Sequence, residues 1–286
     1  MVDINITTAW SSGREPTTGL DQLGIRGNSE RMYGYLVPGI TNLTNRVRYY
    51  SMHSWLVNWW AKNVHAEDSK GFNKKIRIFE CIVGLAEKIK NYDEDSDFLA
   101  VIGSDTFVSW IKDQKSLKDG LTVPLEDLAR KYWKYSSGGF GQYYRGSAET
   151  LDIIKDKEGR TALTALYGLP LAEAFQGNIA DTDLEKMLKS ETATIGQLRK
   201  LVQASTFQKI EKKEALLLQT PLFDKKDKLG PEGVRRRNTL LMVLSLADTT
   251  KSGIAENPLW QVLDAALHGR TTDSKKYSAP EPLKTH

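Results

Sequence analysis

Three groups of basic residues carry the side chains best suited to chemistry with a negatively charged partner. They are Arg46 and Arg48; Lys155, Lys157 and Arg160; and Arg235, Arg236 and Arg237. Lysine and arginine suit phosphate groups, because each contact releases condensed counterions. The second and third groups are also compatible with a solvated face balanced by nearby carboxylates such as Asp224. These eight residues are therefore the candidates for binding a nucleic acid or a partner protein.

Patterns typical of a catalytic or metal centre are missing from the sequence. The four histidines and the single cysteine, Cys81, show no ligand spacing such as H-x-x-x-H or C-x-x-C. There is no G-x-S-x-G nucleophile motif and no nucleotide-binding fingerprint. We therefore expect no metal, no cofactor and no catalytic residues. A catalytic site assembled from distant residues is the alternative.

A glycine-rich segment, Gly138-Gly139-Phe140-Gly141, superficially resembles a phosphate-binding loop. It lacks the Lys-Ser/Thr ending of a P-loop, and no strand leads into it. We interpret it as a hinge or as a place where helices approach closely.

The first basic group lies at the start of an expected long helix. A turn at Pro38-Gly39 precedes it, and Thr41, Asn42 or Thr44 can cap its first turn. Apolar residues then cover most of its circumference to about Val64, which indicates a buried helix. Trp55 and Trp59 or Trp60 are accordingly predicted to be core residues.

Two interpretations of Arg46 and Arg48 follow from this position. One is an arginine anchored in the core by an acid such as Asp21 or Glu30. The other is an arginine pair that binds a phosphate or a partner.

The second basic group lies on an expected β-hairpin. A helix over about 142–151 leads into Asp152-Ile153-Ile154, then a turn at 156–159, a return strand over 161–164 and a helix from about Tyr167. This order is typical of a winged helix-turn-helix, in which the hairpin is the wing. Such modules bind DNA or serve as protein-interaction domains.

The remaining periodicity predicts helices, so the expected fold is mainly α: multi-helical with a small winged-helix-like β hairpin in the middle. The expected divisions are a flexible arm (1–18), an N-terminal helical domain (19–97), a winged-helix-like domain (98–180), a C-terminal helical domain (181–270) and a disordered tail (271–286).

Composition is that of an ordinary globular protein, with a net charge of +4 that permits nucleic-acid binding without requiring it. The N-terminus has no basic and apolar signal pattern, and the longest strongly apolar stretch, 240–247, is far too short to span a bilayer. A single cysteine excludes a disulfide framework. We therefore expect a cytoplasmic protein without a membrane partner.

Several blocks resemble a family of uncharacterised bacterial proteins with a "PGxT…T-x-R-x-R-Y" motif. They are Gly19 to Gly24, Pro38 to Thr44 and Arg46 to Tyr50, followed by 139–146, Leu163-Thr164 and Arg235 to Arg237. Members of that family tend to be encoded in mobile or defence loci beside helicases, nucleases or SMC-like ATPases. The resemblance implies a non-enzymatic accessory subunit of an antiphage or anti-plasmid complex, with those proteins as partners and double-stranded DNA as a further candidate. It implies no known catalytic residue.

Two other functions stay open at this point. One is a nuclease or other effector with a noncontiguous active site, and the other is a stand-alone DNA-binding regulator.

Overall fold

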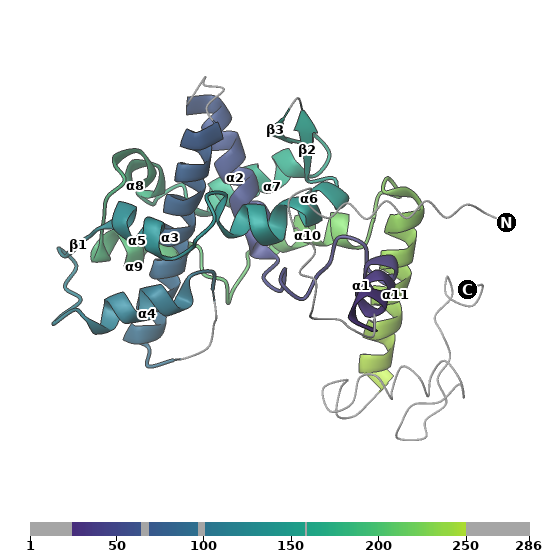
Figure 1. Ribbon diagram of the computed structural model, residues 1–286, viewed down its shortest axis with the longest axis horizontal. Coiled ribbons are helices and arrows are strands. Elements are labelled where there is room, and N and C mark those ends of the chain that lie inside the picture. Colours follow the sequence, from purple (N-terminus) through teal and green to yellow (C-terminus); the bar gives the residue numbers. More distant parts are fainter. Residues whose placement is uncertain (1–24, 64–68, 97–100, 158, 250–286) are drawn as a thin grey trace. The chain divides into compact units, whose positions relative to one another are not determined.

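The computed structural model describes residues 25–63, 69–96, 101–157 and 159–249 (Figure 1). Within these residues there are eleven α-helices, one π-helical segment and two antiparallel sheets of two strands each. The predicted mainly α fold with one small hairpin in the middle is confirmed. None of the helices in these ranges is long and apolar enough to cross a membrane.

The chain forms two compact units, which are discontinuous in sequence. The described part of the first is 42–219, and that of the second is 25–41 together with 220–249. The expected boundaries near residues 97 and 180 do not coincide with this division, because helices from all three expected domains pack together in the first unit. The expected arm and tail lie outside the described residues.

Five helices form the centre of the first unit. α2 (Arg48–Asn63) packs against α7 (Gly168–Asn178), and α3 (Ser69–Asp93) packs against α9 (Ile195–Ala204) and α5 (Leu125–Lys131). Trp55 and Trp59 are buried, with exposed fractions of 1% and 5%. The prediction that Trp55 and one of its two neighbouring tryptophans lie in the core is therefore confirmed.

Shorter elements complete this unit. They are α4 (Ser104–Lys112), β1 (Thr122–Val123), the π-helical segment η1 (Phe140–Tyr144), α6 (Arg145–Thr150), β2 (Ile154–Lys157), β3 (Arg160–Leu163), α8 (Leu184–Ser190), β4 (Ala193–Thr194) and α10 (Lys212–Leu222), whose end belongs to the second unit. β2 pairs with β3 as the predicted hairpin, and its turn contains Gly159 at a φ of 77°. β1 pairs with the distant β4, which local patterns did not indicate.

The start of α2 corrects one expectation. The helix begins at Arg48 rather than in the segment from Thr41 to Thr44, and Leu43, which precedes the helix, is half exposed. The carbonyl oxygen of Arg46 accepts hydrogen bonds from the Tyr49 N–H and the Tyr144 hydroxyl. A tertiary contact therefore takes part in setting where this helix begins.

The second unit is built on α1 (Ile25–Leu36) and α11 (Gly230–Thr249), which pack against each other. The Thr239 hydroxyl donates to the carbonyl oxygen of Leu36, at the end of α1. The Arg235 guanidinium lies over the Tyr35 ring, 4.5 Å from its centre.

Candidate functional sites: a charged hairpin and an aromatic pocket

Arg48 is buried, and all three nitrogens of its guanidinium donate to groups of the first unit. Two nitrogens donate to the Glu214 carboxyl group, at 3.2 and 2.9 Å, and a third donates to the carbonyl oxygens of Thr206 and Lys209. The exposed fractions of the Arg48 and Glu214 side chains are 1% and 0%. Arg48 is thus an arginine anchored in the core, and the acid that anchors it is Glu214, rather than Asp21 or Glu30.

The third basic group is engaged inside the second unit. Arg236 is fully buried and donates to three carbonyl oxygens, those of Pro38, Pro221 and Leu222. Arg237 pairs with Asp227 at 2.5 Å, and Arg235 donates to the Tyr35 carbonyl oxygen. Arg235 therefore joins α11 to the end of α1, Arg237 joins it to the turn that precedes it, and Arg236 joins it to Pro38 and to the end of α10.

The second basic group projects from the β2–β3 hairpin, where Lys155, Lys157 and Arg160 are all exposed. The base of the hairpin is firmly held, because Ile153 and Ile154 are buried.

The start of α7 fastens the other side of that base. The Thr164 hydroxyl donates to the Asp152 carbonyl oxygen and accepts from the Gly168 N–H. Gly168 packs so closely that a side chain there would meet the Ile153 carbonyl oxygen. A charged tip thus stands on a buried, hydrogen-bonded base.

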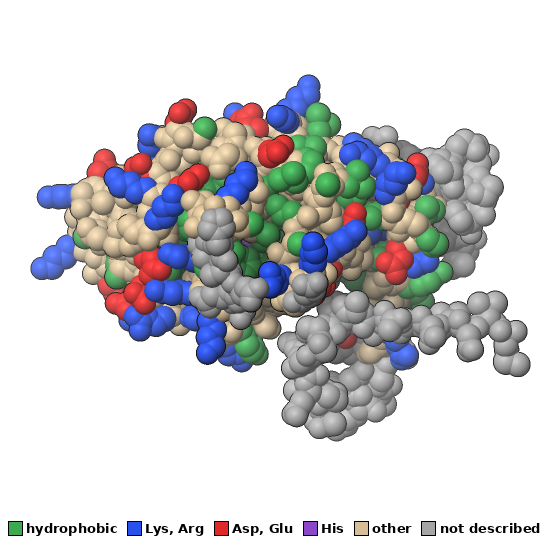
Figure 2. Space-filling view, turned by 90° about the horizontal axis from the view of Figure 1, so that it is seen from above, with side chains coloured by type: hydrophobic (Ala, Val, Ile, Leu, Met, Phe, Trp, Pro, Cys, Tyr) green, Lys and Arg blue, Asp and Glu red, His purple; other side chains and the backbone are tan. Residues whose placement is uncertain are grey.

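Acidic groups balance the basic groups of the hairpin. Lys155 pairs with Asp152 at 3.2 Å, and Asp156 accepts from Arg145 at 3.0 Å and from the Gly159 N–H. On the face shown in Figure 2, basic and acidic side chains are interspersed. The hairpin therefore presents alternating charges and not a broad positive surface.

A buried carboxyl group, Glu80 on α3, organises the interior beside the glycine-rich segment. It accepts hydrogen bonds from the Gly139 and Phe140 N–H groups at 2.8 and 2.7 Å, and from the Tyr132 hydroxyl at 2.5 Å. His53 Nε2 lies 2.9 Å from the same carboxyl group. The N–H groups of the glycine segment therefore do bind a carboxyl group, but it belongs to a side chain of the protein itself.

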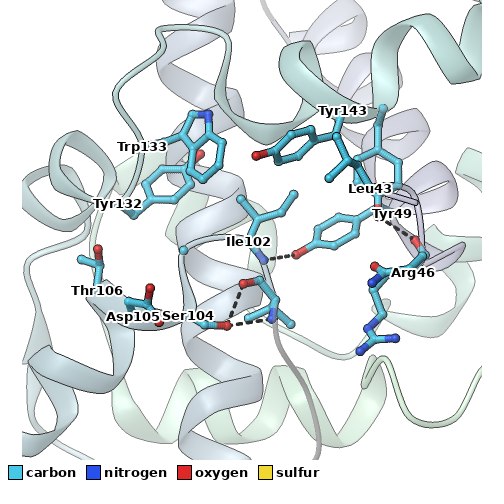
Figure 3. Close-up of a pocket in the computed structure, with 14 residues that line it drawn as sticks. Leu43, Arg46, Tyr49, Ile102, Ser104, Asp105, Thr106, Tyr132, Trp133 and Tyr143 are labelled. Atoms are coloured by element: carbon cyan, nitrogen blue, oxygen red, sulfur yellow. Dashed lines mark hydrogen bonds between the residues drawn. The ribbon is translucent and has the colours of Figure 1, made fainter. Parts of the chain in front are cut away.

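The first unit also contains a pocket of about 410 Å³ (Figure 3). It lies among the segment before α2, the first turn of α4, the end of α5 and η1. Its lining residues are Leu43, Asn45, Arg46, Tyr49, Val101, Ile102, Gly103, Ser104, Asp105, Thr106, Tyr132, Trp133, Tyr143 and Tyr144. Five of these fourteen are aromatic, so ring surfaces form much of the wall.

Three of the pocket's tyrosine hydroxyls are already committed to the protein. Tyr132 donates to Glu80, Tyr144 donates to the Arg46 carbonyl oxygen, and Tyr49 accepts from the Ile102 N–H. Burial raises the pKa of all three hydroxyls, and the charge of Glu80 raises those of Tyr49 and Tyr132 further. These tyrosines remain protonated near neutral pH and offer the pocket their rings rather than a base.

Two residues that line this pocket each carry a buried polar atom without a partner. Arg46 Nε and Trp133 Nε1 are buried, and neither has a hydrogen-bond partner within the described ranges. Arg46 and Arg48 therefore lie in different environments. Arg46 lines a pocket, whereas the guanidinium of Arg48 is hydrogen-bonded in the core.

Arg46 was singled out in the sequence analysis. The buried Glu80 and the other residues that line the pocket were missed. The available signal for Glu80 was an acid inside the apolar run Ile78-Phe79-Glu80-Cys81-Ile82. The pocket had no local signal, because its walls come from four separate segments.

No family model, no curated protein and no solved structure matches this chain. Within the ranges that the structure describes, no three His, Cys, Asp or Glu residues gather in a way that could hold a metal ion.

Proposed function

We propose that this chain is a non-enzymatic accessory subunit that binds a partner protein through the β2–β3 hairpin. The observation that carries the proposal is the hairpin itself, an exposed tip of alternating charge on a buried base. The resemblance of the PGxT block supplies the setting, in which the partner is the ATPase, nuclease or helicase of a bacterial antiphage or anti-plasmid complex.

The charge pattern favours a protein partner over DNA. A surface that binds the DNA backbone needs an excess of positive charge to neutralise several phosphates. Here Asp152 and Asp156 accept ion pairs from Lys155 and Arg145 at the hairpin. Alternating charges on a rigid strand instead match complementary charges on a protein at one register.

The chemistry of Cys81 supports a non-enzymatic role. Its thiol is fully buried, and burial raises its pKa, so the reactive thiolate is not formed near neutral pH. A nuclease or other effector with a noncontiguous site is the competing function, which an activity assay decides.

The test is co-purification of the full chain with the products of its neighbouring genes. The variant Lys157→Glu/Arg160→Glu reverses two exposed charges at paired positions of the hairpin. The control, Lys115→Glu/Lys118→Glu, makes the same change in charge at exposed positions between α4 and β1. We expect the hairpin variant to lose the partner and the control to retain it, with melting temperatures close to that of the wild type.

A DNA-binding measurement on the same variants separates the alternatives. If the hairpin variant keeps its partner but loses affinity for all duplexes alike, with a flatter salt dependence, the hairpin contacts the DNA backbone. That result would overturn the proposed partner contact.

A further inference from the structure

The pocket of the first unit has two chemically different ends. Figure 3 shows the rings of Trp133 and Tyr143 at one end and the guanidinium of Arg46 at the other. Its volume of about 410 Å³ falls in the range of small-molecule sites, about 300–1,000 Å³. A ligand that used both groups of side chains would carry a flat ring and a polar group.

The aromatic end suits a nucleobase. The Trp133 and Tyr143 rings meet edge to face, with centres 5.4 Å apart and an angle of 72° between their planes. A base that stacks on an aromatic side chain gains binding free energy whatever its identity. Trp133 and Tyr143 both line the pocket, so their rings offer it the flat apolar surface on which a base can stack.

The other end suits an anion. Arg46 forms no ion pair with any carboxyl group in the ranges described, and its Nε is buried without a partner. A buried donor without an acceptor is costly, and a charged one more so. A phosphate group offers acceptors in the geometry that a guanidinium fork matches.

Asp105, in the first turn of α4, limits how much negative charge the pocket can take. Its side chain is exposed at the pocket. A carboxyl group there repels a second or third phosphate but accepts hydrogen bonds from sugar hydroxyls. One arginine and one acid therefore favour a ligand with a single phosphate group.

The geometry points to a nucleoside monophosphate as the ligand of this pocket, with its base at Trp133 and Tyr143 and its phosphate at Arg46. This site is separate from the β2–β3 hairpin, so its test and the test of the partner contact succeed or fail independently.

Titration of the full chain tests the assignment. Binding of AMP, GMP, CMP and UMP is followed by tryptophan fluorescence and calorimetry, beside adenosine, guanosine, inorganic phosphate, ATP and a short oligothymidine. We expect saturable binding of at least one monophosphate with a dissociation constant below about 1 mM. It should bind about tenfold or more tightly than its nucleoside, because the charged hydrogen bonds are lost without phosphate.

Two variants test separately whether the phosphate lies at Arg46 and the base at Trp133. Arg46→Gln should erase the difference between monophosphate and nucleoside while leaving the nucleoside's affinity unchanged, a pattern that misfolding would not produce. Trp133→Leu should weaken both ligands about tenfold or more. If Trp133→Leu fails to fold, Tyr143→Leu is used in its place. The matched control for Arg46→Gln is Arg130→Gln, at an exposed arginine on α5 whose partners are Glu126 and Asp127.

Three results would overturn the assignment. The first is an absence of saturable binding for every monophosphate, and the second is equal affinity of the wild type for nucleoside and monophosphate. The third is tighter binding of the oligothymidine than of any monophosphate, which would make the pocket part of a single-strand path.

Discussion

At the scale of single residues, one carboxyl group ties several segments together. Glu80 on α3 receives hydrogen bonds from η1 and its preceding glycine, from the residue that follows α5, and contacts His53 on α2. Tyr132 also lines the pocket. The position of a pocket wall therefore depends on a carboxyl group buried behind it.

Glu80→Gln should destabilise the protein by about 1–3 kcal/mol. Each carboxyl oxygen of Glu80 accepts a hydrogen bond from a backbone N–H, one from Gly139 and the other from Phe140. The glutamine amide would replace one of these oxygens with an NH₂ group, and two donors cannot form a hydrogen bond with each other. The measurement is the free energy of unfolding from urea denaturation. Glu173→Gln, at an exposed position of α7, should change it little; equal effects of the two changes would mean that the buried hydrogen bonds are not what matters.

Trp55→Ala should cost about 3–5 kcal/mol, because it removes a large, fully buried side chain and leaves a cavity. The indole stacks on Phe79 with ring centres 5.6 Å apart, and its Nε1 donates to Gln176 at 2.5 Å. Thermal unfolding measures the loss. Trp60→Ala, where the side chain is only half-buried, should lower the melting temperature less. An unchanged melting temperature for Trp55→Ala would instead place that tryptophan in an interface.

At the scale of elements, α8 is fastened to α3 by the residue that follows it. Glu191 adopts a left-handed conformation, with φ of 56°, and its carboxyl group pairs with Lys74 and Lys75 at 2.6 and 2.8 Å. Partial burial opposes ionisation of Glu191, but the two lysines outweigh it and lower its pKa. An acid of lowered pKa stabilises the folded state above its ordinary titration range, and this contribution is lost as the pH falls through the lowered pKa.

Glu191→Gln should therefore destabilise the protein by about 1 kcal/mol near pH 7, and the difference from wild type should shrink as the pH falls through the lowered pKa of Glu191. Urea denaturation at pH 7 and at an acidic pH measures it. Glu185→Gln on α8, whose partner Lys189 is 3.9 Å away, is the control and should show a smaller pH-dependent difference. A difference that persists unchanged at the lower pH would assign the effect to packing and not to charge.

At the scale of the whole molecule, the purified chain should be catalytically silent. Incubation with plasmid, linear DNA and RNA in the presence of magnesium or manganese should leave all three intact. The expectation follows from the proposed accessory role, in which the chain binds a partner and does not itself cleave nucleic acid. Gel electrophoresis gives the readout, and reproducible cleavage that a single carboxylate substitution abolishes would establish the competing effector function.

The sequence was enough to predict the helices and the hairpin, because interactions between residues close in the chain stabilise these elements. Helical periodicity predicted most of the helices, and a local signal of the same kind begins α9, where Thr194 forms a reciprocal capping box with Gln197. The hairpin followed from its turn, because Gly159 adopts a positive φ without steric cost. These signals act over a few residues, so one sequence contains them in full.

Only the tertiary structure decided which residues meet. The partner of Arg48 lies 166 positions away, and two-residue strands pair between β1 and β4 across a long stretch of chain. Glu80, Tyr132 and the glycine-rich segment converge from three separate places. Nothing in sequence spacing distinguishes Arg46, which lines a pocket, from Arg48, which is saturated in the core. The reason is physical: hydrogen bonding and burial depend on proximity in space, and helix packing sets that proximity independently of distance along the chain.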